Sequence, residues 1–507
     1  MNWLKKHWLL IVILIIALAF RLYRIESTMT FLEDEGRDLL IVKRMIDTGR
    51  PVLLGPQTST GNMYLGPLYY YLITPALYLA GMNPVGPAIL IALSGVLTVY
   101  LLYYLGKKWF GTAAGYLAAI LFAVLPYSVM VTRASWNPNL VPLIATIMLI
   151  IYNRLVYGRA TLKTWFAYGL AIGVMVQLHY MALVYCCILS LSIAWNKRKD
   201  FIQLVRGVPL VMIGLIFMLL PFIVFEIRNN WVNTHAIARF MQAKEEKIIR
   251  YDPPLWLWWG KVSKTSYRLI GNSLAGSEMS AQPVTPYIAA GFIVLVLLSL
   301  ALAISHPNKI YLNLFIIFLG CMAVLGIYQE NIHLHYIEFA LPLIFLALAG
   351  VFRPQSPKWL VTTGSLFLLL VFGFGITRSL GYITSGATHQ AKKARDVAAY
   401  IVAKAGGEPY NVVSTQGTYT TPFQYFLAVS PHPPSNLLTK QVFDICAGYP
   451  CPIDDETTTL LFLTGPGHPS IANYLGHPEL NSYSLKRQMV SNEHVSVGIW
   501  VAEIVLE

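Results

Sequence analysis

Charged side chains are scarce in this sequence of 507 residues. Asp, Glu, Lys and Arg together make up 12% of the chain, about half the share that is usual in soluble domains. Hydrophobic residues make up 56% of it. This composition excludes a disordered chain and an ordinary cytosolic enzyme of the same length. It therefore indicates a polytopic membrane protein.

Cysteine is scarce as well. Five cysteines are too few for a disulfide framework, and Cys186, Cys187 and Cys321 lie in apolar segments where we expect no reaction. Cys446 and Cys451 lie close together in CAGYPC. The sequence is compatible with a disulfide between them and equally with two unpaired thiols.

Several kinds of binding site are also missing. The sequence has no glycine-rich loop that would hold phosphates, and no basic run that is both long and interleaved with aromatic residues. A nucleotide-sugar donor and a nucleic-acid partner are therefore not expected, although the net charge is +13. His333 and His335 have a spacing that can bind a metal, but no third ligand stands at a matched distance, so no metal site is expected.

Apolar runs dominate what is present, and a run of about 20 residues is needed to cross the membrane as a helix. The first extends from Trp8 to about Ile25, after Lys5 and Lys6, and no small-x-small cleavage site follows it. We therefore expect an uncleaved anchor with a cytoplasmic N-terminus. Further runs begin near Val85, Thr112, Val141, Thr164, Met181, Val208, Tyr287, Ile310, Ile337 and Leu360, which makes about eleven crossings.

Lys and Arg gather in alternate short loops, whereas the loops at 177–180 and 329–336 contain neither. This alternation follows the positive-inside rule only if the apolar segment 64–81 does not cross the membrane. That segment carries two prolines and five tyrosines, and tyrosine favours the headgroup boundary. We therefore expect an interfacial or re-entrant helix on the outer face, and an extracytoplasmic C-terminus.

These features predict a polytopic α-helical membrane domain at 1–377 and a small extracytoplasmic α/β domain at 378–507. Outer loops are expected at 27–84 and 228–286 of the first domain. The second begins with HQAKKARDVAAYIVAKAGG, a helical pattern that ends at glycines, and the runs YNVVST, TTTLLFLT and VGIWVAEIVL are typical of strands. We expect a multi-pass protein of the plasma membrane.

The stretch after the first crossing, FLEDEGRDLLIVKRMIDTG, contains four carboxylates in six positions: Glu33, Asp34, Glu35 and Asp38. An amphipathic helical pattern follows and ends at Gly49. The acids could simply complement the dipole of this helix. A site that receives cationic or hydroxyl-bearing molecules is the other interpretation.

EDEGRD after the first crossing, followed by GPLYYY in the interfacial segment, resembles the GT-C glycosyltransferases of the family 39 type. Protein O-mannosyltransferases and lipid A aminoarabinose transferases are the relatives in question, and the resemblance covers Met1 to Arg378. It implies transfer of a monosaccharide from a polyprenyl phosphate to an acceptor hydroxyl on the outer face, with inversion. The implied partners are the lipid-linked sugar, an acceptor protein, lipid or glycan, and the bilayer.

The resemblance also implies roles for single residues. Asp34 matches the general base, with Glu35 beside it, and a carboxylate in this role takes the proton of the attacking hydroxyl. Arg37 matches a contact of the lipid phosphate, and an ion pair with Glu33 or Asp38 is its alternative. A lysine that contacts the phosphate in the aminoarabinose branch is Gly66 here.

Three further outer-face clusters supply candidate ligands for the donor phosphate or sugar. In TRASWNPNL, Arg133 is either such a ligand or an anchor of a helix end. Asn137 stands near the place where related transferases often carry a second acid, and an amide can bind a sugar but cannot take a proton. The other candidates, in QLHY and NIHLHYIEFALP, are His179, Tyr180, His335 and Tyr336.

Tyr336 resembles a tyrosine of the aminoarabinose branch that contacts the lipid phosphate; anchoring at the interface is its alternative.

We expect that the reaction requires no cofactor, although the sequence does not exclude a bound divalent cation. The main alternative function is a lipid or sugar transporter or flippase. Transporters usually have repeated halves and ionisable groups near the membrane centre, and neither is recognisable here.

Overall fold

The structure is a computed structural model of the chain. It describes residues 2–58, 63–242, 253–276, 285–305, 308–328, 330–414, 420–434, 460–465, 487–496 and 499–506. Cys446 and Cys451 lie outside the described residues. The chain forms two compact units: unit 1 is Met1–Tyr23, Val52–Tyr69 and Ile89–Gly386, and unit 2 is Arg24–Pro51, Tyr70–Ala88 and Ala387–Glu507. The boundary expected between 377 and 378 stays a prediction.

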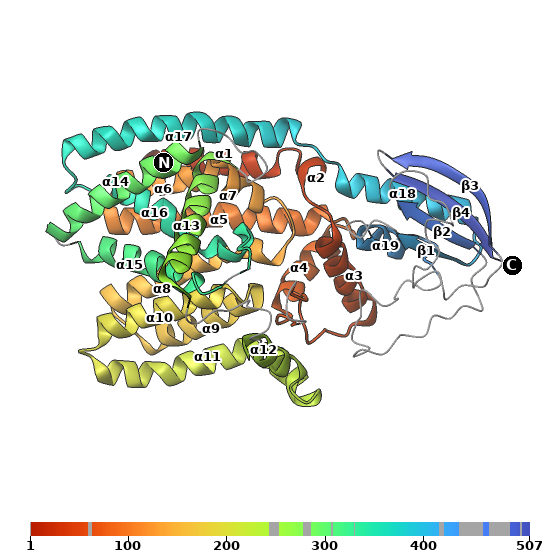
Figure 1. The fold of residues 1–507 in the computed structure, drawn as a ribbon, viewed down its shortest axis with the longest axis horizontal. Helices are drawn as coiled ribbons and strands as arrows, with labels where there is room; N and C mark the ends of the chain where they lie inside the picture. Colours follow the sequence, from red (N-terminus) through yellow and green to blue (C-terminus); the bar gives the residue numbers. More distant parts are fainter. Residues whose placement is uncertain are drawn as a thin grey trace. The chain divides into compact units, whose positions relative to one another are not determined.

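Apart from an isolated β-bridge between Gln57 and Tyr64, the regular secondary structure in the described part of unit 1 is helical (Figure 1). Its α-helices are α1 (Asn2–Leu22), α5 (Val85–Phe110, whose first residues belong to unit 2), α6 (Thr112–Val124), α7 (Pro126–Val131), α8 (Val141–Tyr157), α9 (Leu162–Leu178), α10 (Ala182–Lys197), α11 (Phe201–Arg228), α12 (Val232–Gln242), α13 (Leu255–Ala275), α14 (Thr285–Ser305), α15 (Lys309–Leu325), α16 (Leu341–Gly350) and α17 (Lys358–Ser385). Two 3-10 helices, η1 (Asn137–Leu140) and η2 (Leu334–Ala340), precede α8 and α16.

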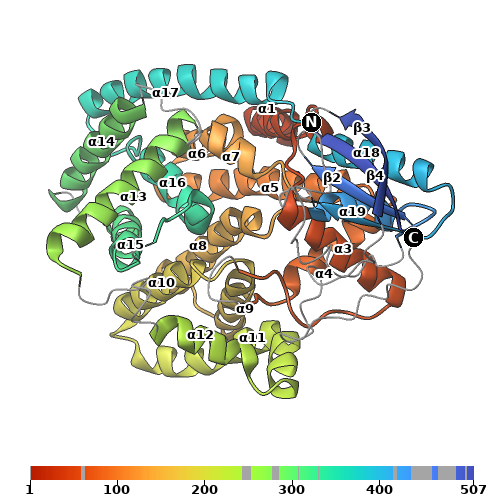
Figure 2. The same ribbon diagram turned by 45° about the vertical axis from the view of Figure 1, so that its right-hand side comes forward.

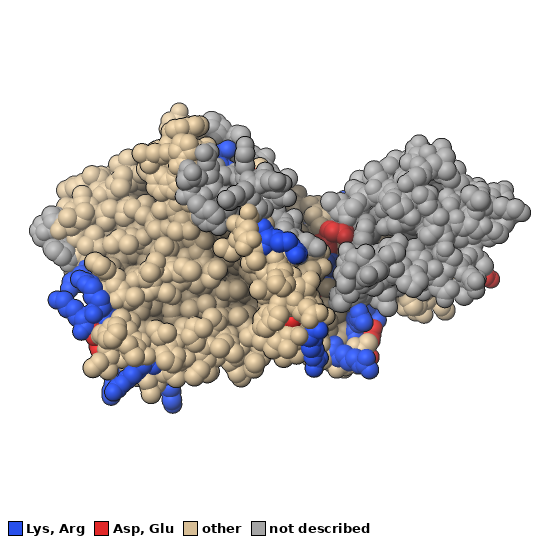
Figure 3. Space-filling view, turned by 60° about the horizontal axis from the view of Figure 1, so that its bottom comes forward, with Lys and Arg blue, Asp and Glu red and all other residues tan. Residues whose placement is uncertain are grey.

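Five segments of the described chain, those that contain α5, α8, α11, α14 and α17, are long and apolar enough to cross a membrane. Shorter apolar helices include α1, α6, α9, α10, α15 and α16. On the face shown in Figure 3, a broad area bears no charged side chain, and Lys and Arg gather at its left-hand edge. Exposed apolar side chains such as Ile213, Phe217 and Leu220 of α11 would be unfavourable in water and suit contact with lipid. The structure is therefore that of a multi-pass membrane protein.

Unit 2 combines helices with a small sheet. Its helices are α2 (Ile25–Thr28), α3 (Glu33–Thr48), α4 (Leu68–Leu79, which starts in unit 1), α18 (Gln390–Ala405) and α19 (Thr420–Ala428). Its strands are β1 (Tyr410–Ser414), β2 (Leu460–Gly465), β3 (Arg487–Ser496) and β4 (Ile499–Leu506). The sheet order is β1-β2-β4-β3, with β1 and β2 parallel and the other pairs antiparallel. The parallel pair needs a crossover, and α19 lies in that connection.

Helices α18 and α19 lie beside the sheet (Figures 1 and 2). The buried side chains of α18 recur at helical spacing: Ala391, Ala394, Val397, Ala398, Ile401 and Ala405. In α19, Phe423, Tyr425 and Phe426 are buried, and the rings of Tyr425 and Phe426 pack edge-on against Phe31. This aromatic core joins the segment before α3 to the C-terminal part of the same unit.

One sequence prediction for unit 2 is confirmed by a helix boundary. α3 ends at Gly49, which has the left-handed conformation (φ 64°) expected of a residue beyond a helix end. α4 has 12 residues and is therefore only about 18 Å long. That the segment 64–81 does not cross the membrane stays a prediction.

Candidate active site

The predicted site residues divide between the two units. Unit 2 contains Asp34, Glu35 and Arg37, all on α3. Unit 1 contains Arg133, Asn137, His179, Tyr180, His335 and Tyr336. The two groups are described in turn, each within its own unit.

Glu35 caps the N-terminal end of α3. The residue before the helix is Leu32, which has no side-chain oxygen to accept the free backbone N–H groups of the first turn. The carboxylate of Glu35 accepts a hydrogen bond from the Leu32 N–H (3.1 Å) and another from the Thr30 hydroxyl (2.5 Å). Both of its oxygens are thus engaged, and the side chain is buried. These contacts favour helix capping for Glu35.

Glu33 and Gly36 connect α3 to α19. The Thr421 hydroxyl donates to the Glu33 carbonyl (2.5 Å), and the Thr421 N–H donates to the Glu33 carboxylate (3.3 Å). Glycine at position 36 permits this close approach, because a Cβ there would lie 2.5 Å from the backbone nitrogen of Pro422. The first turn of α3 is therefore fixed against a segment from the C-terminal part of the chain.

Arg37 lies between two carboxylates. Its Nη1 donates to Asp34 Oδ1 (2.7 Å), one helical turn away. Its Nε and Nη2 both donate to Asp38 Oδ1, at 3.0 and 2.7 Å. The Tyr70 hydroxyl of α4 donates to the same oxygen (3.1 Å). The predicted ion pair with Asp38 is thus present, together with a second one to Asp34.

Asp34 and Asp38 differ sharply in exposure. The Asp34 side chain is 43% exposed and that of Asp38 is 1% exposed. Burial raises the pKa of Asp38 to about 7, even though the neighbouring Arg37 acts in the opposite direction. Burial likewise raises the pKa of Glu33 and of Glu35. Asp34 is the member of this acidic group that combines an ion pair with open access to solvent.

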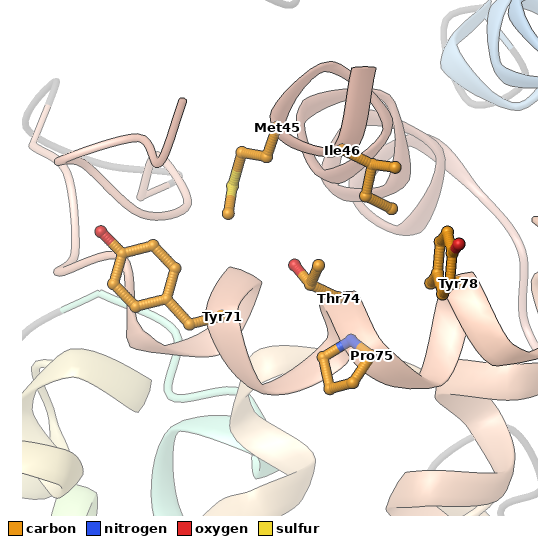
Figure 4. A pocket seen from close by; sticks show the side chains of 6 residues that line it. All are labelled: Met45, Ile46, Tyr71, Thr74, Pro75 and Tyr78. Carbon is orange, nitrogen blue, oxygen red and sulfur yellow. The ribbon is translucent and has the colours of Figure 1, made fainter. Parts of the chain in front are cut away.

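An apolar pocket lies between α3 and α4, about two helical turns after Asp38 along α3. Its volume is about 420 Å³. Figure 4 shows Met45 and Ile46 of α3 facing Tyr71, Thr74 and Tyr78 of α4 across the opening; Pro75 completes the lining. Its lining is almost entirely hydrocarbon and aromatic, so it suits an apolar chain better than a sugar.

In unit 1, Arg133 contacts the end of a helix. Its Nη1 donates to the carbonyls of Phe20 and Arg21, and its Nη2 donates to that of Tyr23. The last carbonyls of a helix have no partner within the helix, so Arg133 satisfies the C-terminal end of α1. These contacts favour the anchoring alternative for Arg133.

Asn137 and the segment around Gly66 contact the C-terminal end of α9. The Asn137 amide donates to the Leu178 carbonyl (2.6 Å). A Cβ at Gly66 would overlap the side chain of Gln177, so no side chain fits there without rearrangement. The amide nitrogen of Gln177 donates to the carbonyls of Gly173 and Met218. The lysine of the aminoarabinose branch therefore has no equivalent charge at this position.

Tyr180 belongs to a hydrogen-bond network around Tyr64. Its hydroxyl donates to the Tyr64 carbonyl, which also accepts from the Asn233 amide (3.1 Å). The Tyr64 N–H donates in turn to the Asn233 side chain (2.6 Å). Buried Glu226 accepts the N–H groups of Asn233 and Thr234 (3.1 and 2.7 Å) at the start of α12. Tyr180 thus fixes the chain before α4.

His179, His335 and Tyr336 come together in one aromatic cluster, which Trp136 joins. The ring of His335 lies 4.4 Å from that of Trp136, 4.6 Å from that of Tyr336 and 5.9 Å from that of His179. Burial lowers the pKa of His179 to about 4, so its imidazole is neutral near pH 7. Within the described residues, no group of three His, Cys, Asp or Glu side chains has a metal-site arrangement.

Several partners of these residues were not predictable from the sequence. Asp38 and Tyr70 stand in the two motifs that carry the family resemblance, but adjacent letters do not reveal which tyrosine of GPLYYY faces α3. Asn233 and Thr421 have no recognisable motif around them. Their contacts arise from packing between segments far apart in the chain, at separations of 169 residues for Asn233 and 388 for Thr421.

Comparison with known proteins identifies the fold. Residues 65–225 match the family described as dolichyl-phosphate-mannose-protein mannosyltransferase. No curated protein matches the sequence. Similar solved structures include ArnT from Cupriavidus metallidurans bound to undecaprenyl phosphate (TM-score 0.61, 14% identity, covering 99% of this chain and 98% of that one).

Apo ArnT of the same organism is also similar (TM-score 0.62, 12% identity, 98% of both chains). The oligosaccharyltransferase of Archaeoglobus fulgidus in complex with Zn and sulfate is more distant (TM-score 0.53, 13% identity, 90% of this chain and 67% of that one). The predicted resemblance to GT-C glycosyltransferases is thereby confirmed, and so is the prediction of a glycosyltransferase. The comparisons do not favour a transporter or flippase.

Proposed function

We propose that this chain, a glycosyltransferase with the GT-C fold, moves a monosaccharide from a polyprenyl phosphate to a hydroxyl group of a protein, lipid or glycan. The acceptor oxygen forms a bond to the anomeric carbon and its proton passes to Asp34. The bond between that carbon and the phosphate oxygen breaks, and the electron pair leaves with the phosphate. Attack opposite to the leaving group inverts the anomeric carbon.

One observation carries this proposal: Asp34 is the acid at the motif position of the base that remains accessible. Glu35, its neighbour, has both carboxylate oxygens engaged in capping α3. Asp34 accepts one bond from Arg37 through Oδ1 and is 43% exposed, so Oδ2 can receive a proton. A general base must reach the proton that it abstracts, and this requirement selects Asp34.

Arg37 supports the assignment of a phosphate leaving group. Its side chain is 16% exposed and is therefore not fully enclosed by the protein. A guanidinium beside a departing phosphate stabilises the charge that develops as the bond breaks. Because the phosphate leaves as an anion, the reaction needs no general acid.

The lipid part of the donor is supported by two observations. The apolar pocket between α3 and α4 suits a hydrocarbon chain, and it lies on the helix that bears Asp34 and Arg37. ArnT, which shares the fold, was solved with undecaprenyl phosphate. In unit 1, we assign the cluster of Trp136, His179, His335 and Tyr336 to binding a sugar or phosphate group by stacking and hydroxyl contacts.

The proposal includes a topology. Eleven crossings, with the N-terminus in the cytoplasm, place residues 378–507 outside the plasma membrane as an α/β domain. The alternation of basic loops supports this placement, because a crossing at 64–81 would move every later basic loop to the outer side.

The test is Asp34→Asn, assayed in liposomes with a panel of polyprenyl-phosphate monosaccharides and a membrane extract as acceptor. We expect at least about a 100-fold lower transfer rate, because an amide cannot take the proton. Binding of undecaprenyl phosphate should persist. Asp47→Asn, on the exposed side of the same helix, is the matched control and should transfer normally.

Glu35→Gln separates the two neighbouring acids. Its expected effect is a lower melting temperature, with a turnover number close to that of the wild type in the folded fraction, because Glu35 caps the helix. A wild-type rate in Asp34→Asn together with an inactive, well-folded Glu35→Gln protein would move the base to Glu35. Normal rates in both would remove the base from this helix.

A further inference from the structure

Hydrogen bonds to two carboxylates of α3 hold the guanidinium of Arg37. Of its five N–H groups, three donate to Asp34 and Asp38. The Tyr70 hydroxyl of α4 also interacts with this guanidinium. The Arg37 side chain is 16% exposed, so a phosphate that approaches from outside could reach it without displacing either carboxylate.

Asp38 contributes most to this arrangement. It receives two of the three bonds from Arg37, and its side chain is 1% exposed. Asp34 receives one bond and is largely open to water, which weakens an ion pair. An ion pair out of contact with water is much less screened, so Asp38 determines the orientation of Arg37.

Tyr70 fixes Asp38 from the opposite helix. Its hydroxyl donates to Oδ1, so three of the donors around Asp38 converge on that single oxygen. The other oxygen, Oδ2, is buried and has no hydrogen-bond partner among the described residues. A buried carboxylate with one empty oxygen is unfavourable for stability alone. This cost suggests that the carboxylate serves Arg37.

We infer that Asp38 and Tyr70 are positioning residues of the proposed reaction, which hold the Arg37 guanidinium in the orientation that contacts the donor phosphate. The inference rests on the proposed function, in which Arg37 binds that phosphate. The competing account is a structural tether: the bond between Tyr70 and Asp38 would merely join α4 to α3. The two accounts differ in whether the effect of Asp38 requires Arg37.

A double-mutant cycle measures this dependence. The dissociation constant of undecaprenyl phosphate is determined in detergent for the full-length wild type, Asp38→Asn, Arg37→Ala and the double variant. We expect Asp38→Asn to weaken binding about tenfold, and Arg37→Ala by at least as much. In the double variant, binding should equal that of Arg37→Ala within about twofold, because no guanidinium is left to orient.

A second double-mutant cycle replaces Asp38→Asn by Tyr70→Phe, so that the test remains possible if the Asp38 variant does not fold. We expect a smaller loss of affinity, again only when Arg37 is present. Asp47→Asn makes the same chemical change on the same helix, where its partner is Lys43, and should leave the dissociation constant unchanged.

Melting temperatures identify which of these variants are folded. Equal fold-losses from Asp38→Asn or Tyr70→Phe with and without Arg37 would overturn the inference in favour of the tether. The same conclusion follows if neither change affects binding. Wild-type affinity in Arg37→Ala would instead refute the phosphate contact in the proposed function.

Discussion

At the scale of single residues, the four acids of EDEGRD have four different environments. Glu33 binds Thr421, Glu35 caps α3, Asp38 holds Arg37, and Asp34 faces solvent. Each difference follows from what lies next to the side chain, since the chemistry of the carboxyl groups is the same.

The buried acids should make stability depend on pH. Asp38 has a pKa of about 7 in the folded protein against an ordinary value of 3.8, so the folded state holds its proton more tightly than the unfolded state. This contribution is fully present below about pH 4 and is lost as pH rises to about 7, at about 1.4 kcal/mol for each pKa unit. The raised pKa values of Glu33 and Glu35 act in the same direction.

We therefore expect the melting temperature in detergent to fall between pH 5 and pH 8, and to fall less in Asp38→Asn. Arg37, Asp34 and Tyr70 surround Asp38 and are present in both proteins, so the difference reports on Asp38. A melting temperature that rises with pH, or equal slopes in both proteins, would contradict the burial of this carboxyl group.

The sequence predicted part of this site. The family motif pointed to Asp34 and Arg37, and helical spacing placed them one turn apart. The burial of Asp38 was not predictable, because it depends on Tyr70, 32 residues away on another helix. The capping contact of Glu35 was foreseeable only as an alternative, since Leu32 gives no sign of a cap.

At the scale of elements, the packing of α3 on α19 depends on Gly36. Gly36→Ala should destabilise the protein by about 1–3 kcal/mol, because the new methyl group would meet the backbone of Thr421 and Pro422, which cannot move aside alone. Thermal unfolding in detergent measures this change.

Gly381→Ala is the control, because a Cβ there meets nothing within 4 Å and alanine favours a helix. Equal melting temperatures for the two variants would refute the close packing of these helices.

Periodicity predicted the long elements better than the short ones. The helical patterns that became α3 and α18 end at Gly49 and Gly406, as glycine signals indicate. Helix α19 was not predicted, because nine residues that include a proline carry little helical signal by themselves. Its contacts with Phe31 and Gly36 supply the stabilisation that the local sequence lacks.

At the scale of the whole molecule, the charge alternation predicts which parts face outward. Tyr78 is 65% exposed at the end of α4, so Tyr78→Cys should react with a membrane-impermeant maleimide in intact cells lacking the native cysteines of this chain. Lys199→Cys, in a loop predicted to be cytoplasmic, should react only after permeabilisation.

A reporter fused after Glu507 should be active only outside the cytoplasm. Labelling of Tyr78→Cys from the cytoplasm alone would show that the segment 64–81 crosses, and would reverse the sides of all later loops. The sequence could predict this pattern because membrane insertion follows hydropathy and loop charge, which are local properties.

The bond between Thr421 and Glu33 joins residues that are 388 positions apart. At translation rates of about 5–20 residues per second, Glu33 leaves the ribosome roughly 20–80 s before its partner exists. During that interval the first turn of α3 lacks the neighbour that fixes it. A chain interrupted anywhere before position 421 would therefore carry the EDEGRD motif without this support for its first helical turn.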